Sequence, residues 1–246
     1  MAEIESLDAL MVWVMNKLAE RFGPKAILKG GMLLKLLDCP RHTNDLDYVF
    51  APYRSKKDIV TAILKALSEL EGAKVHHSLH STSLRIILEY NDLKVQIEAN
   101  VSETCASQEM STASLARSVN QLPRVIRVMK LEESLAHKMA AWNERGLMRD
   151  LYDIYYFYTR LRIKPDLDVL KKRLSKINDR QKFANQSKVK SMTMNDFLGK
   201  LQKTAELIDD QSLKAELQGI LSIEELIGLN LKIRRSLLEL IENIQE

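Results

Sequence analysis

The sequence predicts an α+β protein in which a small mixed-sheet domain, residues 1–125, precedes an all-helical domain, residues 126–246. Strand-like segments are confined to the first half of the chain, near 26–28, 45–51, 83–90 and 93–101. After about residue 128, apolar residues recur at the three- and four-residue spacing of helices. Glycine and proline number only 8 and 5 in 246 residues, which favours helix in the chain as a whole.

The N-terminal elements alternate between helix and strand. An amphipathic helix is predicted over 5–21 and ends at Gly23-Pro24. A short strand over 26–28 then runs into Gly30-Gly31 and a second short helix. The polar loop 40–44 leads to a strand over 45–51, and a further helix follows over 55–71.

The rest of the chain changes from strands to helices. Leu84, Ile86 and Leu88 alternate with polar residues in one predicted strand, as Leu93, Val95 and Ile97 do in the next. The stretch 102–124 is rich in Ser, Thr, Asn and Gln, so we expect it to be irregular and to serve as the linker. Helices are predicted over 129–145, 149–161, 166–177, 193–208 and 223–244.

Composition indicates an ordinary globular protein of the cytoplasm. Apolar residues make up 46% and charged residues 28%. The acidic start has no basic segment followed by an apolar one, and no apolar run approaches the roughly 20 residues that span a bilayer. Cys39 and Cys105 have no metal-type spacing and imply no disulfide framework. We therefore expect a cytoplasmic location and no membrane partner.

Charge is distributed unevenly in the second half. From Arg160 to Lys190 there are 11 Lys and Arg against three Asp, whereas 203–246 holds nine acids and five bases. The basic stretch would suit a polyanionic substrate, with Lys171, Lys172, Arg173, Lys176 and Arg180 as candidate phosphate contacts. Solvated helix faces would produce the same composition.

The main chemical signal is Asp45-Leu46-Asp47 at the start of a predicted strand. Residues two apart on a strand point to the same face, which brings Asp45 and Asp47 together at roughly 6–7 Å between Cα atoms. Two carboxylates that close repel each other unless a cation lies between them. Mg²⁺ prefers such oxygen ligands and takes substrate phosphates as well, and a pair of ions would suit nucleotide transfer.

Two further features fit this scheme. A side-chain-free turn at Gly30-Gly31 would let backbone N–H groups approach a triphosphate. In the strand over 93–101 the odd-numbered residues are apolar, which leaves Glu98 on the polar face as the candidate third carboxylate. Arg41 and Thr43 would orient the aspartates, or they are ordinary turn residues.

Two other clusters of residues are interpreted as structural rather than functional. His76, His77 and His80 lack an accompanying Cys or acid cluster and indicate a polar loop or the start of a strand. Tyr152, Tyr155, Tyr156 and Tyr158 have helical spacing within an apolar segment, which favours packing over base stacking.

Three blocks resemble the AbiEii/AbiGii-type nucleotidyltransferase toxins of abortive-infection and type IV toxin–antitoxin systems. The first two are Leu28-Lys29-Gly30-Gly31-Met32-Leu33-Leu34 and Arg41-His42-Thr43-Asn44-Asp45-Leu46-Asp47. The third runs from His137-Lys138-Met139-Ala140-Ala141 through Arg145 to Arg149-Asp150-Leu151-Tyr152-Asp153-Ile154. The resemblance covers about residues 25–155. Gly31 and Asn44 depart from the wider polymerase-beta-like pattern, where Ser is common at both positions.

The resemblance implies roles for the third block. Lys138 would bind the triphosphate of the nucleotide, and Asp150 would complete or orient the active site. Lys138, Trp142, Arg145, Arg149 and Asp153 would share a face of one continuous helix, unless Gly146 interrupts it. An exposed, salt-bridged helix is the alternative.

We therefore predict a Mg²⁺-dependent transfer of a nucleoside monophosphate from an NTP to an acceptor hydroxyl. Asp45, Asp47 and Glu98 would hold the metal, and the same three residues would act in catalysis with Lys138 and Asp150. Gly30, Gly31, Thr43 and Lys138 would bind the nucleotide. The resemblance implies RNA, with tRNA as one case, or protein as the acceptor, and a cognate antitoxin as a partner. A small-molecule, antibiotic-type nucleotidyltransferase and a catalytically silent binding module of the same fold are the alternatives.

Overall fold

The computed structural model describes residues 4–175 and 192–245. The chain divides into two compact units, Met1–Lys130 and Leu131–Glu246, which are described separately. Lys176, Arg180 and the end of the predicted 166–177 helix lie outside the described residues.

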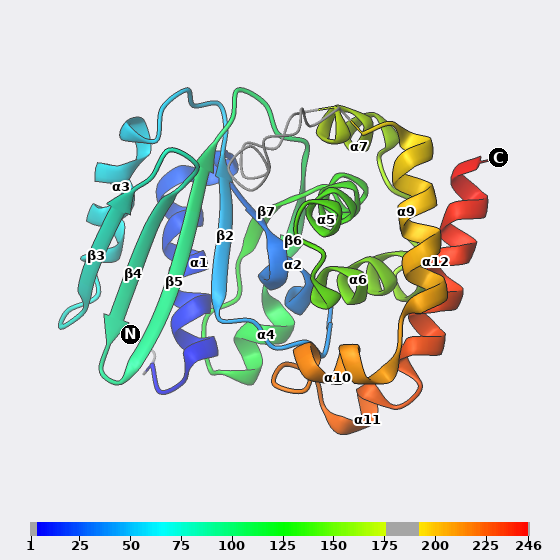
Figure 1. Ribbon diagram of the computed structural model, residues 1–246. Helices are drawn as coiled ribbons and strands as arrows, with labels where there is room; N and C mark the ends of the chain where they lie inside the picture. The colour runs from blue at the N-terminus through cyan, green and yellow to red at the C-terminus, as the bar shows by residue number, and fades with distance from the viewer. Residues whose placement is uncertain (1–3, 176–191, 246) are drawn as a thin grey trace. The chain divides into compact units, whose positions relative to one another are not determined.

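Unit 1 is built on a mixed seven-stranded sheet with the order β3-β4-β5-β2-β1-β7-β6 (Figure 1). Its two parallel pairs are β1 with β7 and β2 with β5, and the other neighbours are antiparallel. The strands are β1 (Ala26–Lys29), β2 (Asp45–Phe50), β3 (Lys74–Leu79), β4 (Leu84–Tyr90), β5 (Leu93–Val101), β6 (Ser107–Ser111) and β7 (Val125–Met129).

One face of the sheet forms the core of unit 1. In β4 and β5 every second residue is fully buried, and these side chains are Leu84, Ile86, Leu88, Val95, Ile97 and Ala99. Helix α1 (Leu7–Phe22) packs against α3 (Lys57–Leu67) and against β5. The Ser6 hydroxyl caps α1 by accepting from the Ala9 N–H at 3.1 Å. The remaining elements of the unit are η1 (Gly23–Lys25), α2 (Gly30–Leu36) and α4 (Ala113–Ser118).

Unit 2 is helical throughout its described residues. Its elements are α5 (Leu131–Arg145), α6 (Met148–Tyr155), a π-helical turn η2 (Tyr156–Arg160), α7 (Leu167–Leu174), α9 (Met194–Leu207), α10 (Asp210–Leu217), α11 (Ile223–Leu226) and α12 (Leu229–Gln245). Helix α12 packs on α9 and on α6. Tyr152, Tyr155 and Tyr156 are buried, as expected for packing residues.

The predicted fold class is confirmed, because a mixed sheet with helices is followed by helices alone. The strands predicted near 26–28, 45–51, 83–90 and 93–101 correspond to β1, β2, β4 and β5. No helix within the described residues is long and apolar enough to cross a membrane.

Several local predictions were wrong. The expected linker over 102–124 contains β6 and α4, and β7 follows it. Strand β6 lies at the edge of the sheet, where polar and charged side chains discourage pairing with another chain, so it lacks an apolar pattern. The helix predicted over 223–244 is interrupted at Gly228, which has a φ of 64°, and α10 was not predicted.

Candidate active site

The candidate carboxylates lie side by side on the polar face of the sheet in unit 1. Strand β2 runs parallel to β5, with Asp45 opposite Gln96 and Asp47 opposite Glu98. Residues in register on neighbouring strands point to the same face, so all four side chains share it. Leu46, between the two aspartates, is fully buried on the opposite face.

Two cations flank these carboxylates at the same level of the sheet. Lys29 on β1 is opposite Asp47, with Nζ 4.0 Å from Oδ1. Arg85 on β4 is opposite Glu98, with Nη2 3.0 Å from Oε1. The row Lys29–Asp47–Glu98–Arg85 therefore crosses four neighbouring strands. Sequence reasoning missed both cations, because their positions beside the carboxylates depend on which strands are neighbours.

Gly30 lies directly against Asp47. Its φ of 75° is one that residues with a side chain rarely adopt. A Cβ atom built at Gly30 would also overlap the Asp47 carboxylate, at 2.9 Å from its Cγ. A glycine is therefore required here both for its backbone angle and for the space that Asp47 occupies.

Gly31 makes room for the loop that precedes β2. A Cβ atom there would lie 2.7 Å from Thr43 Oγ1 and 2.8 Å from Arg41 Nη2. Arg41 is buried, and its Nη1 donates to the His42 carbonyl at 3.3 Å. The loop thus places Arg41 and Thr43 against the glycine turn. Whether they also orient the aspartates remains a prediction.

The carboxylates are accessible. Asp45 is exposed, and the side chains of Asp47 and Glu98 each keep 29% of their accessible surface. Three carboxylates on one open face, next to a glycine turn, offer the hard oxygen ligands that Mg²⁺ prefers. Within residues 4–175 and 192–245, no three His, Cys, Asp or Glu side chains already stand in a metal-binding arrangement. Glu98 instead contacts Arg85.

In unit 2, the predicted residues form two ion pairs between α5 and α6, and both carboxylates are buried. Lys138 Nζ lies 2.6 Å from Oδ2 of Asp153, whose side chain is 1% exposed. Asp150 is fully buried and forms a two-pronged pair with Arg145, with Nε–Oδ2 and Nη2–Oδ1 both at 2.6 Å. Each carboxylate of α6 thus has a cation of α5 as its partner.

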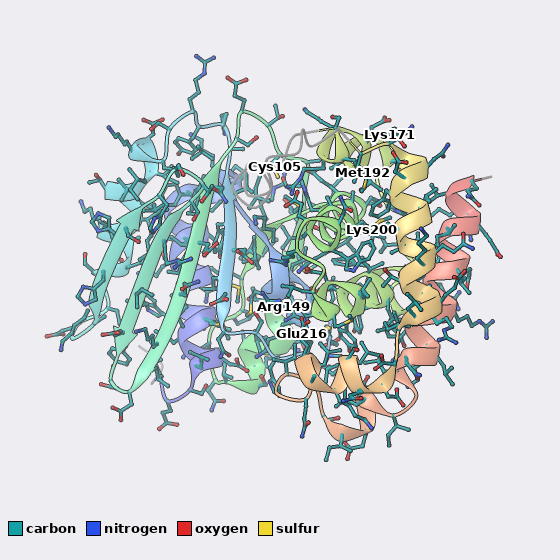
Figure 2. All side chains as sticks on the ribbon, viewed as in Figure 1. Cys105, Arg149, Lys171, Met192, Lys200 and Glu216 are labelled. Atoms are coloured by element: carbon teal, nitrogen blue, oxygen red, sulfur yellow. The ribbon has the colours of Figure 1, made fainter. Side chains whose placement is uncertain are left out.

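The helix is not continuous across this block. Gly146, with a φ of 68°, separates α5 from α6, so the single shared face predicted from Lys138 to Asp153 does not form. The side chain of Glu216 caps the start of α6 by accepting from Met148 N at 2.9 Å and from Arg149 N at 3.1 Å. Arg149 and Glu216 are labelled in Figure 2.

Burial shifts the pKa values of Lys200 and Tyr48. Burial lowers the pKa of Lys200, whose Nζ donates to the Asn143 carbonyl at 2.8 Å and lies 5.0 Å from the centre of the Trp142 ring. Burial raises the pKa of Tyr48, so the phenol stays neutral on the core face of β2. Neither group belongs to the carboxylate row.

Two solved structures from Helicobacter pylori resemble this chain. The structure of JHP933 shares 14% sequence identity, covers 96% of this chain and 90% of its own, and gives a TM-score of 0.54. The structure of a "putative nucleotidyltransferase" shares 17%, covers 97% and 95%, and gives a TM-score of 0.57. These likenesses define the class, an α+β protein with the fold of these two structures. No curated protein matches the sequence.

The family is shown by the sequence. The profile of the family described as nucleotidyl transferase AbiEii toxin, type IV TA system, matches residues 13–225, most of the chain. The chain therefore belongs to the AbiEii family and is a nucleotidyltransferase. The family match includes both the carboxylate strand of unit 1 and the paired helices of unit 2.

Proposed function

We propose that the protein transfers a nucleoside monophosphate from an NTP to an acceptor hydroxyl, with Asp45, Asp47 and Glu98 at the reacting centre. The observation that carries this proposal is the register of β2 and β5, which sets the three carboxylates on one accessible face beside Gly30. Family membership independently supports nucleotide transfer.

Asp45 and Asp47 would hold Mg²⁺, since both are carboxylates with access to solvent. The bound ion would neutralise charge on the phosphates and on the departing pyrophosphate. Because Gly30 has no side chain, the Asp47 carboxylate can lie close to the turn at the start of α2.

Glu98 would accept the proton of the acceptor hydroxyl. The acceptor oxygen then forms a bond to the α-phosphorus, and the bond from the α-phosphorus to its bridging oxygen breaks. Pyrophosphate leaves with that electron pair. Arg85 fixes the Glu98 carboxylate at 3.0 Å and so limits its rotation.

The NTP phosphates would lie at Gly30, Gly31 and Thr43, where the Thr43 hydroxyl faces the space that a side chain at position 31 would fill. Lys138 and Asp150 are proposed from the family pattern, as a phosphate ligand and as a residue that orients the active site. In unit 2 both are already paired, with Asp153 and with Arg145. A phosphate at Lys138 would therefore share the ammonium with Asp153.

The family name describes toxins of type IV toxin–antitoxin systems. We propose that the acceptor is RNA, with tRNA as one case, or protein, that a cognate antitoxin limits the activity, and that the reaction takes place in the cytoplasm. The mild net charge of +4 does not select between the two acceptors.

The test is a transfer assay with each of the four NTPs, radiolabelled at the α-phosphate, in Mg²⁺ or in EDTA. Total RNA, total protein and an aminoglycoside panel serve as separate acceptors. We expect Mg²⁺-dependent label on RNA or on protein, and none with Asp45→Asn. Label on an aminoglycoside alone would indicate the small-molecule alternative. Absence of label from every acceptor would indicate the silent binding module.

A further inference from the structure

The polar face of the sheet continues past Glu98 to the free edge of β3. Arg85 on β4 is opposite Glu98 on one side and opposite Ser78 of β3 on the other. One level further along, His76 of β3 is opposite Ile87, which is opposite Gln96. These side chains therefore share the face of Asp45 and Asp47. We call Arg85, Ser78, His80 and His76 the β3–β4 strip.

The strip is exposed and rich in hydrogen-bond donors. The Arg85 side chain is 46% exposed, and its contact with Glu98 uses Nη2 of a guanidinium that has five N–H donors. Ser78 Oγ lies 3.0 Å from His80 Nε2, and both residues are exposed, as is His76. Lys56 Nζ holds the turn after β3 by donating to the carbonyls of His80 and Ser81, each at 2.7 Å.

Charge on this part of the face is positive on balance. The acids there are Glu98, which pairs with Arg85, and Glu89, which lies opposite both Lys74 and Lys94. Lys94 contacts it at 3.0 Å and holds the pKa of Glu89 below its usual value. Among the described residues on this part of the face, the three cations Lys74, Lys94 and Arg85 therefore outnumber the two acids.

The strip is also continuous with the proposed reacting centre. Neighbouring strands lie about 4.8 Å apart, so the path from Glu98 across Arg85 to Ser78 is about 10 Å long. Phosphates follow one another at about 3.4 Å along the axis of a stacked strand, and so more than one fits along this path. A protein acceptor would have no general need for a cationic path of this kind.

We infer that the β3–β4 strip binds the phosphodiester backbone of a single-stranded polynucleotide acceptor, with the terminal hydroxyl at Glu98 and the chain leaving over β3. This inference rests on the proposed role of Glu98 and adds the acceptor class and the surface that recognises it. Arg85 and His76 contact backbone phosphates, and Ser78 with His80 donates to the next one.

The test measures binding of a fluorescently labelled single-stranded RNA to the full chain in EDTA, by anisotropy at several salt concentrations. The variants are Arg85→Gln, Arg85→Lys and His76→Gln. His77→Gln is the matched control, because His77 is exposed on the same strand but is opposite buried Ile86 and so belongs to the other face. Transfer by wild type to RNA and to protein is measured separately.

Arg85→Gln is expected to weaken RNA binding about five- to tenfold and to lower the log–log salt slope by about 0.7. His76→Gln, which does not contact Glu98, should weaken binding in the same direction, while Arg85→Lys and His77→Gln stay near wild type. Equal RNA binding by all variants would overturn the proposal that the strip binds RNA. An equal loss of RNA binding in His77→Gln would also overturn it. Transfer to protein with no affinity for RNA also overturns it and leaves the proposed function intact. RNA binding that follows this pattern, without nucleotide transfer to any acceptor, would support RNA binding by the strip and contradict the proposed function.

Discussion

Carboxylates in the two units of this molecule have opposite surroundings. On the sheet, Asp45 is exposed, and Asp47 has its nearest cation, Lys29, at 4.0 Å. In the helical unit, Asp150 and Asp153 are fully buried, and each has a cation at 2.6 Å. The aspartates of the helical unit are thus enclosed with a cation, whereas those of the sheet keep access to solvent.

The buried and the exposed carboxylates should contribute differently to stability, because their surroundings differ. A buried carboxylate that loses its partner or its charge leaves an uncompensated group, which costs about 3–5 kcal/mol. An exposed carboxylate with a distant cation contributes little to stability, about 1 kcal/mol at most. Substitutions in the helical unit should therefore act on folding, and substitutions on the sheet should act on chemistry.

The largest effect is expected for Asp153→Asn. The amide cannot neutralise Lys138, whose side chain is only 16% exposed, so the free energy of unfolding should fall by about 3–5 kcal/mol. Trp13→Phe would leave Trp142, on α5 of the same unit, as the sole tryptophan reporter for urea unfolding. An unchanged midpoint and slope would show that the pair contributes nothing to the fold.

Gly30→Ala should damage catalysis more than stability. The new Cβ would displace the Asp47 carboxylate, and a misplacement of about 1 Å lowers rates about 100-fold. Gly72→Ala is the matched control, because Gly72 also has a positive φ, 82°, but no atom within 4 Å of its built Cβ. Both variants are assayed for transfer and for thermal unfolding. Equal transfer rates in the two would mean that Asp47 does not need its place beside Gly30.

Lys138→Ala should weaken both the use of NTP and the stability of the fold. Loss of a charge-assisted contact to the NTP would weaken NTP use by about 1.5–3 kcal/mol, and Asp153 would lose the ammonium that lies 2.6 Å from it. Pairing it with Asp153→Ala separates the two effects: stability should partly recover in the double variant, and the KM for NTP should not. Recovery of both the stability and the KM for NTP would mean that Lys138 stabilises the fold and does not bind the nucleotide.

The smallest effect is expected at the start of α6. Glu216→Gln keeps one acceptor oxygen, so only one of the Met148 and Arg149 N–H groups retains its partner, and it removes the charge that interacts with the helix dipole. Stability should fall by about 0.5–1 kcal/mol in urea unfolding. A loss as large as that of Asp153→Asn would mean that the cap, rather than the ion pairs, holds α6 in place.

Sequence reasoning found the elements with a strong apolar pattern and missed the others. Strands β4 and β5 alternate clearly because one face is buried, whereas the edge strands β3 and β6 show no such alternation. The candidate carboxylates could be found from local spacing. Lys29 and Arg85 could not, because their position depends on which strands are neighbours, and the sequence leaves that order open.

The burial of Asp150 and Asp153 was also beyond local reasoning. A charged residue every three or four positions is typical of an exposed helix, and only the packing of α6 on α5 shows that these carboxylates are enclosed. The break at Gly146 was open to prediction, since glycine often ends a helix.

We propose that Asp45 and Asp47 serve chemistry and not the fold. The decisive experiment measures nucleotide transfer and urea unfolding side by side for Asp45→Asn and Asp47→Asn. We expect no detectable transfer by either variant, with unfolding free energies within about 1 kcal/mol of wild type. Near-normal transfer by both variants would contradict the account, and so would loss of transfer that comes only with loss of the folded state.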